Sequence, residues 1–148
     1  MASSANTRRT HATPSQIWAV LSDGSRYAEW VHGTREIRDV DDGWPDEGTS
    51  IHFTVGYGPL RLRDRTTSRL CVPEERLELE AHAWPVGTAR IGLFIGRSRD
   101  GSIITMDEHP LRGPAGWLHN PLSAMGFQLR VTLMLDDLAR LAEAEPST

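Results

Sequence analysis

Two carboxylates in strand-like segments are the residues of this sequence best suited to acid–base chemistry. Glu108 lies near the end of the run IITMDEH (103–109), and Asp64 lies in the arginine-rich run LRLRDRTTSR (60–69). A strand points alternate side chains to opposite faces, so each carboxylate faces either solvent or a core. Burial raises the pKa of a carboxyl group and suits it to general acid or base catalysis. The direction of each side chain therefore decides whether it is a catalytic candidate.

The composition predicts one globular domain over residues 1–148, with an ordered core over about residues 7–142. The net charge of −4 argues against a nucleic-acid binder, because phosphate neutralisation needs a clustered basic surface. A single cysteine, Cys71, allows neither an intrachain disulfide nor a Cys-based zinc site. No signal core and no run of 18 apolar residues is present, so we expect a cytoplasmic protein without a membrane segment.

The elements that must position these carboxylates follow from periodicity and turn signals. Thr13-Pro14-Ser15-Gln16 predicts a capped helix that ends before Asp23, preceded by a strand over 5–11 and followed by a short helix over 25–30. Period-two patterns predict strands over 34–41, 49–57, 60–72, 76–84, 88–98 and 102–110. A last helix is expected over about 119–144. Its apolar stripe comprises Leu122, Met125, Phe127, Val131, Leu135, Leu138 and Leu141. This order predicts an α+β fold in which an antiparallel sheet wraps around the last helix.

The register of the central hairpin places Asp64 on the inner face. A shift of one residue moves every side chain of a strand to the opposite face, so neighbouring hairpins can be checked against each other. Closing the hairpin over residues 73–74 sets Thr66 opposite Ala81 and Leu70 opposite Leu77. The two apolar faces then coincide, and Asp64 shares the inner face with Thr66.

The next hairpin places Glu108 on the same inner face. A two-residue loop at 100–101 sets Ile95 opposite Met106 and Leu93 opposite Glu108. A three- or five-residue loop would turn these side chains outward, and the apolar pattern favours the first choice. Three strand spacings, roughly 14 Å, would then separate Glu108 from Asp64, too far for a shared proton.

The inner face also carries small residues where a filled core would have leucines. Ala81, Ala83, Ala89 and Gly92 are expected there, together with the polar Thr66. A polar and incompletely filled interior predicts a cavity that holds a ligand.

The order of elements and the residues of 17–64 and 101–122 resemble the SRPBCC superfamily of START-like, helix-grip proteins. Trp30, Trp44-Pro45 and Gly48 match the usual pattern of that superfamily, which includes polyketide cyclases/aromatases and lipid-transfer domains. The chain is most similar to bacterial polyketide cyclase/dehydrase-like members, over about residues 7–142. The resemblance implies a helix-grip (START/Bet v-like) fold, with a curved antiparallel sheet around a long C-terminal helix and an apolar cavity between them. It also implies that Trp30 lies near one mouth of the cavity, and it carries over no catalytic motif.

Each candidate has a structural interpretation beside the functional one. Glu108 and Asp64 can be proton-transfer groups or rim carboxylates paired with an arginine; Arg130 on the last helix can meet either acid, a ligand anion or solvent. Glu78, Glu80 and His82 line one strand face like a metal site, but their register is outward. There, Arg69 opposite Glu78 makes cross-strand charge pairing the better interpretation. We therefore expect no metal and no cofactor.

Three functions follow from this interpretation. The first is binding of a hydrophobic or amphipathic, lipid- or polyketide-like small molecule in the internal cavity. The second is a polyketide cyclase/dehydratase-type enzyme with an inward carboxylate, and the third is a partner-docking module. No nucleic-acid partner is expected, and the protein is a monomer or a homodimer. The catalytic candidates are Glu108 and Asp64. The expected ligand-binding residues are Trp30, Phe53, Thr66, Ala81, Ala83, Ile91, Leu93, Met106, Trp117, Leu122, Met125 and Arg130.

Overall fold

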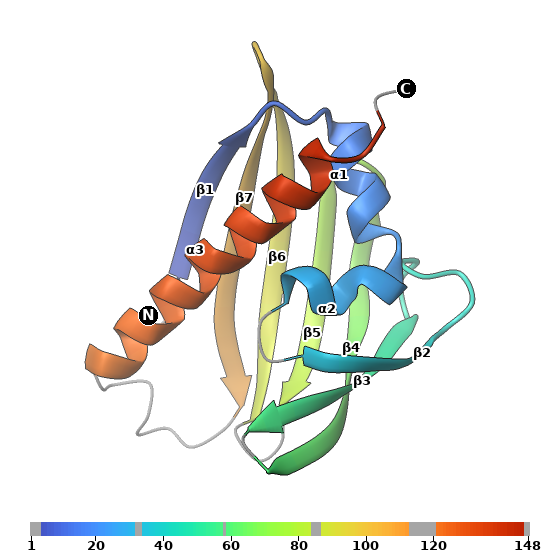
Figure 1. The fold of residues 1–148 in the computed structure, drawn as a ribbon, viewed down its shortest axis with the longest axis vertical. Coiled ribbons are helices and arrows are strands. Elements are labelled where there is room, and N and C mark those ends of the chain that lie inside the picture. Colours follow the sequence, from blue (N-terminus) through green and yellow to red (C-terminus); the bar gives the residue numbers. More distant parts are fainter. Residues whose placement is uncertain (1–3, 32–33, 58, 84–86, 113–120, 147–148) are drawn as a thin grey trace.

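One antiparallel sheet and the helices on its inner face make up the part of the chain described by the computed structural model, residues 4–31, 34–57, 59–83, 87–112 and 121–146 (Figure 1). Its strands, in the spatial order β1-β7-β6-β5-β4-β3-β2, all pair antiparallel. The strands are β1 (Ser4–Thr10), β2 (Thr34–Val40), β3 (Ser50–Tyr57), β4 (Leu60–Val72), β5 (Arg76–Ala83), β6 (Gly87–Ser98) and β7 (Gly101–Arg112).

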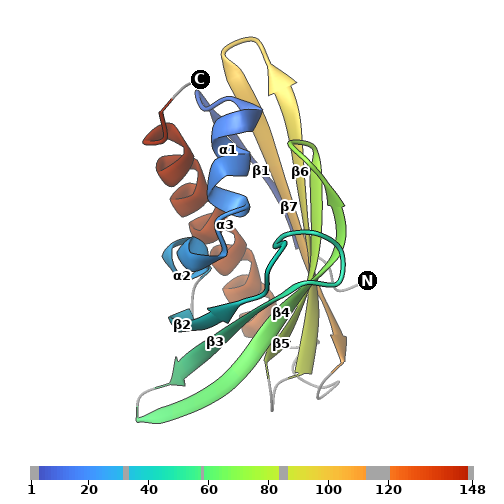
Figure 2. The same ribbon diagram turned by 90° about the vertical axis from the view of Figure 1, so that its right-hand side faces the viewer.

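The helices all lie on one side of the sheet, which curves around them (Figure 2). They are α1 (Pro14–Leu21), the 3-10 turn η1 (Gly24–Arg26), α2 (Tyr27–Trp30) and the long α3 (Pro121–Glu143). The predicted order of elements is thus confirmed, and most predicted ends lie within two residues of the observed ones. The outer face of the sheet carries no helix in the described part of the chain.

The start of α1 is the capping box that the sequence predicts. Thr13 Oγ1 accepts a hydrogen bond from the backbone N–H of Gln16 at 3.2 Å, and the Gln16 side chain accepts one from the Thr13 N–H at 2.8 Å. Both bonds satisfy N–H groups that the first helical turn would otherwise leave without partners. Gln16 also donates through Nε2 to the Glu145 carbonyl at 2.6 Å, which ties α1 to the end of α3.

The core lies between α3 and the centre of the sheet. Val131, Leu135 and Leu138 of the predicted stripe are buried, and Leu141 is half-buried. The side chains of the other members of the stripe, Leu122, Met125 and Phe127, lie outside the described part of the chain. Further buried side chains that the stripe did not include are Met134, Ala139 and Ala142. The sheet contributes Leu77, Leu79, Ile91, Leu93, Ile104 and Met106, each at most 1% exposed.

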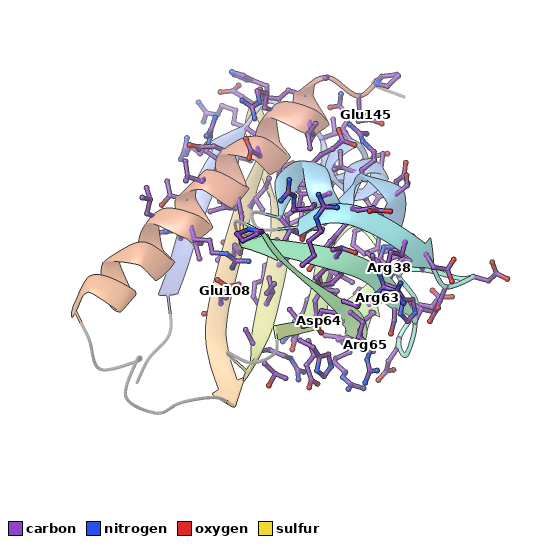
Figure 3. All side chains as sticks on the ribbon, turned by 60° about the horizontal axis from the view of Figure 1, so that its bottom comes forward. Arg38, Arg63, Asp64, Arg65, Glu108 and Glu145 are labelled. Atoms are coloured by element: carbon purple, nitrogen blue, oxygen red, sulfur yellow. The ribbon has the colours of Figure 1, made fainter. Side chains whose placement is uncertain are left out.

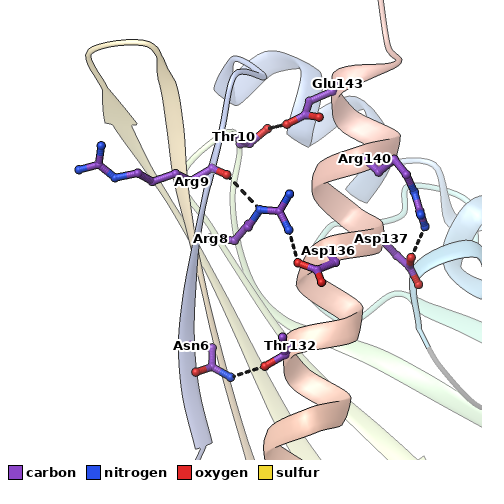
Figure 4. A network of polar contacts seen from close by, with 9 residues as sticks. All are labelled: Asn6, Arg8, Arg9, Thr10, Thr132, Asp136, Asp137, Arg140 and Glu143. Atoms are coloured by element: carbon purple, nitrogen blue, oxygen red, sulfur yellow. Dashed lines mark hydrogen bonds and ion pairs between the residues drawn. The ribbon is translucent and has the colours of Figure 1, made fainter.

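Polar contacts attach α3 to the edge strand β1 (Figure 4). Asn6 donates to Thr132 at 3.1 Å, Arg8 forms an ion pair with Asp136, and Thr10 donates to Glu143 at 2.6 Å. The contacts follow α3 from its middle to its last turn. They fix the position of the helix along the sheet while its apolar face covers the core.

The hairpin of β4 and β5 has the predicted register in one half and a bulge in the other. Thr66 pairs with Ala81 as predicted, but the register shifts between Ser68 and Leu70. Cys71, not Leu70, therefore lies opposite Leu77 and packs on the core. The backbone of Ser68 is held by hydrogen bonds to the 45–49 connection, including a 2.8 Å bond from its N–H to the carbonyl of residue 49. A bulge of this kind reverses the faces of the residues beyond it.

The hairpin of β6 and β7 has the predicted faces, but its pairing register differs from the predicted one by two residues. Its loop is Arg99-Asp100, so Ile91, not Leu93, lies opposite Glu108. Gly101 instead begins β7, where a Cβ atom would lie 2.2 Å from the carbonyl oxygen of Thr10. Gly101 is thus needed for the close approach of the chain that follows β1, and it is not a loop residue.

The outer face of the sheet carries cross-strand ion pairs, as the sequence predicts. Glu78 of β5 pairs with Arg90 of β6, and Arg69 of β4 pairs with Glu80 of β5 at 2.9 Å. Glu78 also pairs with Arg76 within β5. The predicted partner of Arg69 was Glu78, and the bulge after Ser68 accounts for the difference. Gly92 lies opposite Glu78 on this outer face, so its expected place on the inner face is wrong.

Candidate functional site

Glu108 points to the inner face of the sheet, and its side chain is only 2% exposed. Its neighbours of the same parity on β7, Ile104 and Met106, are fully buried. Both carboxylate oxygens accept a hydrogen bond from Nη1 of Arg130 on α3, at 2.7 and 2.5 Å. The sheet and the last helix therefore meet here through a buried carboxylate and a guanidinium.

The two partners of this ion pair differ in exposure. The side chain of Arg130 is 36% exposed, so the pair extends from the core face toward the surface. Burying a carboxylate costs several kcal/mol unless a charged partner and hydrogen bonds compensate for the loss of water. Arg130 supplies that compensation. The sequence allowed Arg130 to meet an acid, a ligand anion or solvent, and the structure shows that it meets Glu108.

A second polar contact lies in the same interior, between Tyr27 of α2 and Thr66 of β4. The Tyr27 hydroxyl and Thr66 Oγ1 are 2.7 Å apart, and the two residues are 2% and 0% exposed. The ring of Tyr27 packs against Trp30 and Phe53, with ring centroids 5.5 Å apart in each case. Aromatic packing on two sides and the bond to Thr66 hold the phenol in a defined position.

Burial raises the pKa of Tyr27 to about 12, although the hydrogen bond between Tyr27 and Thr66 and the charge of Arg130 lower it. The carboxylates of Glu108 and Asp64 raise it further. Tyr27 therefore remains a neutral hydroxyl at physiological pH, which can donate as well as accept a hydrogen bond. The same interactions show that the two polar contacts lie within electrostatic range of each other.

Asp64 lies on β4, three strands from β7, as the sequence predicts (Figure 3). It shares its face with Thr66, but it is half-buried, whereas Thr66 is fully buried. Its Oδ1 accepts a hydrogen bond from the N–H of Arg65 at 2.9 Å. Glu108 and Asp64 are thus separate groups that flank the interior and do not form a dyad.

The other expected site residues divide into core residues and one accessible position. Trp30, Phe53, Ile91, Leu93 and Met106 are buried at 0–4% exposure. Trp30 is therefore packed in the core against Tyr27, and its expected place near a cavity mouth stays a prediction. Ala81 is half-buried, as is its cross-strand partner Ala89.

Several expected site residues lie outside the described part of the chain. Trp117 belongs to the connection before α3, and the side chains of Ala83, Leu122 and Met125 are not described either. Conversely, sequence reasoning did not find Tyr27. Its spacing of three from Trp30 places both on one helical face, and the inward Thr66 hydroxyl needed a partner; these two signals together would have identified it.

The site supplies hydrogen-bond donors and one buried carboxylate, which suits it to bind a polar group inside an apolar pocket or to transfer a proton. Among the described residues, no three side chains of His, Cys, Asp or Glu gather as metal ligands would. Glu78 and Glu80 on the outer face are engaged with arginines.

A curved antiparallel sheet with a long C-terminal helix against its inner face defines a helix-grip protein, and solved structures share this fold. TTHA0849 from Thermus thermophilus superposes with a TM-score of 0.75 at 14% identity, over 98% of this chain and 99% of that chain. The di-domain ARO/CYC StfQ from the steffimycin biosynthetic pathway gives 0.71 at 12% identity, over 97% and 49%. DynU16, a protein in the dynemicin biosynthetic locus, gives 0.69 at 16% identity, over 97% and 48%.

The family itself follows from the sequence match. Residues 1–143 match the family described as polyketide cyclase/dehydrase and lipid transport, and the chain belongs to this SRPBCC-type family. No curated protein matches the sequence significantly. In the described part of the chain, no helix has the length and apolar character needed to span a membrane.

Proposed function

We propose that the protein binds a hydrophobic or amphipathic small molecule, lipid- or polyketide-like, in a cavity between the sheet and α3. The observation that carries this proposal is the inner face at Ala81 and Ala89. These cross-strand partners lie on the face that fully buries Leu79 and Ile91, yet both remain half-buried. Small side chains at facing positions leave volume unfilled, and protein interiors otherwise pack as densely as organic crystals.

The polar contacts of the interior support an amphipathic ligand over a plain hydrocarbon. Ligand pockets are mostly apolar with a few polar groups that fix orientation. Leu79, Ile91 and Phe53 make the interior apolar, while Glu108 with Arg130 and Tyr27 with Thr66 supply the polar groups. Family membership, whose description includes lipid transport, supports the same class of ligand.

Native mass spectrometry of the purified protein under gentle desolvation tests the proposal. We expect an apolar adduct, or binding from a panel of lipids and aromatic polyketides, that is lost in Ala81→Trp because the indole fills the space. The matched control is Arg65→Trp, since Arg65 is an exposed residue of the neighbouring strand and points to the opposite face of the sheet. The control should keep the adduct.

A protein that carries no adduct and binds nothing in the panel would refute the proposal. Loss of the adduct in both tryptophan variants would also speak against an interior site. Circular dichroism of both variants establishes that each is folded before binding is compared.

The second candidate function is a cyclase/dehydratase-type enzyme, and the buried Glu108 favours it. In this mechanism the pocket would hold a flexible poly-carbonyl chain folded for ring closure, and Glu108 would move protons while Arg130 orients its carboxylate. StfQ, a structural neighbour, is a di-domain ARO/CYC from the steffimycin biosynthetic pathway. Glu108→Gln should then keep ligand binding and lose turnover of a poly-carbonyl substrate. Unchanged turnover in this variant would show that Glu108 is not the catalytic group.

The partner-docking alternative ranks last. A docking module is expected to expose a contiguous apolar patch on the outer face of the sheet. Among the described residues of the sheet, Val72 is the one large apolar side chain that is exposed, and the strands around it carry ion pairs.

A further inference from the structure

The contact between Tyr27 and Thr66 has two hydroxyl hydrogens, but only one of them forms the hydrogen bond between the two residues. Each hydroxyl carries one hydrogen, and only one of the two can lie between oxygens that are 2.7 Å apart. Whichever residue donates, the other keeps an O–H hydrogen. Among the described residues, neither hydroxyl has a second hydrogen-bond partner. At exposures of 2% and 0%, this surplus donor is buried.

A buried donor without an acceptor costs about 1–3 kcal/mol, so such groups normally have a partner. The surroundings keep this donor in place. Trp30 and Phe53 pack against the Tyr27 ring, and β4 holds Thr66 in its pairing with Ala81. Because Ala81 is half-buried on the same inner face, the hydroxyls lie beside the part of the face that the proposed ligand would occupy.

The charges around the pair indicate which kind of acceptor fits. Three charged side chains act on Tyr27: Arg130, Glu108 and Asp64, of which two are acidic. The one cation is already held by Glu108 through both carboxylate oxygens. The two acids and one cation make the surroundings net negative, so an added anion would be repelled, whereas a neutral oxygen would not be.

We propose that the Tyr27–Thr66 hydroxyl pair donates a hydrogen bond to a neutral carbonyl-type oxygen of the ligand, so that the site takes ketone-bearing apolar molecules in preference to hydrocarbons and carboxylates. The inference rests on the proposed function and narrows its ligand class. The raised pKa of Tyr27 agrees with it, because the phenol remains a donor across the physiological range.

Three probes of one shape test the inference: 2-acetylnaphthalene, 2-ethylnaphthalene and 2-naphthoate, titrated by isothermal calorimetry. The wild-type protein should bind the ketone roughly tenfold more tightly than the ethyl compound, the value of one hydrogen bond. It should bind the carboxylate most weakly. In Tyr27→Phe/Thr66→Val, which removes both hydroxyls with little change in shape, the preference for the ketone should disappear.

Control variants separate hydrogen bonding from folding. Thr66→Ser keeps both hydroxyls and should keep the preference for the ketone, and urea unfolding shows whether each variant is folded. Infrared spectroscopy of the bound ketone gives a direct reading. Its C=O stretch should lie at lower wavenumber in the wild-type complex than in the complex with the double variant.

The outcomes distinguish the two proposals. If no probe binds to the folded wild-type protein, and the lipid and polyketide panel also fails, the proposed function itself is wrong. If the ketone and the ethyl compound bind equally well, with the same C=O stretch in both proteins, the pocket exists and the hydroxyl pair does not recognise the ligand. Tightest binding of 2-naphthoate would likewise overturn the choice of a neutral acceptor.

Discussion

At the scale of single residues, the interior of this protein combines charge and neutral hydroxyls in a small region. Glu108 remains buried because Arg130 reaches it from α3 with a hydrogen bond to each oxygen. Tyr27 remains neutral because burial disfavours the phenolate. The two contacts therefore have different chemistry, since one is an ion pair and the other is a pair of neutral hydroxyl groups.

The raised pKa of Tyr27 makes stability depend on pH in the alkaline range. Unfolded tyrosine ionises near pH 10, whereas Tyr27 in the folded protein ionises near pH 12. Below pH 10 the contribution of Tyr27 to stability is fully present. As the pH rises from 10 to 12, only the unfolded state ionises, so the free energy of unfolding should fall by roughly 2–3 kcal/mol.

Denaturant unfolding at pH 9, 10, 11 and 11.5 measures this change. All sixteen basic residues of the sequence are arginines, so no lysine titrates in the same range. Tyr57→Phe and Cys71→Ser remove the two other side chains that would titrate. In this background, adding Tyr27→Phe should flatten the pH dependence, and parallel curves with and without Tyr27 would contradict the assignment.

At the scale of elements, the register of two hairpins determines which side chains enter the interior. The loop Arg99-Asp100 places Glu108 opposite Ile91, and the bulge after Ser68 brings Cys71 to the core in place of Leu70. Alternation along each strand predicted the faces of Glu108 and Thr66 correctly. The exact partners depended on contacts with the 45–49 connection and with the chain after β1, and these are distant in sequence.

Among the glycines of the described residues, Gly101 has the closest backbone neighbours, and its φ of +152° is one that L side chains rarely adopt. An added Cβ would lie 2.2 Å from the Thr10 carbonyl oxygen and 2.7 Å from the His11 carbonyl carbon, which are backbone atoms that have little room to shift. We expect Gly101→Ala to lower the free energy of unfolding by more than about 2 kcal/mol. Urea denaturation followed by tryptophan fluorescence gives the value.

Gly96 of the same hairpin is the matched control. A Cβ at Gly96 would meet only the Ile103 carbonyl oxygen, at an ordinary 3.9 Å. Gly96→Ala should therefore change stability by less than about 0.5 kcal/mol. If the two substitutions have equal effects, the close contact between Gly101 and the backbone of Thr10 and His11 does not limit stability.

At the scale of the whole molecule, the end of α3 connects elements from the start of the chain. Glu143 accepts a hydrogen bond from Thr10, and Glu145 forms an ion pair with Arg26 at 2.7 Å. The hydrogen bond to Glu145 raises the pKa of the Arg26 guanidinium. Together with the contacts of Figure 4, these interactions hold α3 across the inner face and thereby hold Arg130 near Glu108.

A chain that ends at Ala142 tests this connection. It lacks both glutamates, and we expect its free energy of unfolding to fall by about 2–3 kcal/mol or more. Two partly buried, charge-assisted hydrogen bonds are lost, and so is the bond from Gln16 to the Glu145 carbonyl. A chain that ends at Pro146 keeps both contacts and should match the full-length protein in thermal denaturation. The prediction fails if the two shortened chains are equally stable.

The sequence by itself determined the order and type of the elements, the capping box of α1, the inward direction of Glu108 and Thr66, and the charge pairing of the outer face. These features depend on alternation, caps and turn residues within short segments, which is why local patterns predict them. Only the tertiary structure decided that Arg130 is the partner of Glu108, that Tyr27 meets Thr66 and that Trp30 belongs to the core. Each of these contacts joins segments 22 to 39 residues apart or depends on packing against such a contact, and no local pattern encodes which distant side chain fills the space.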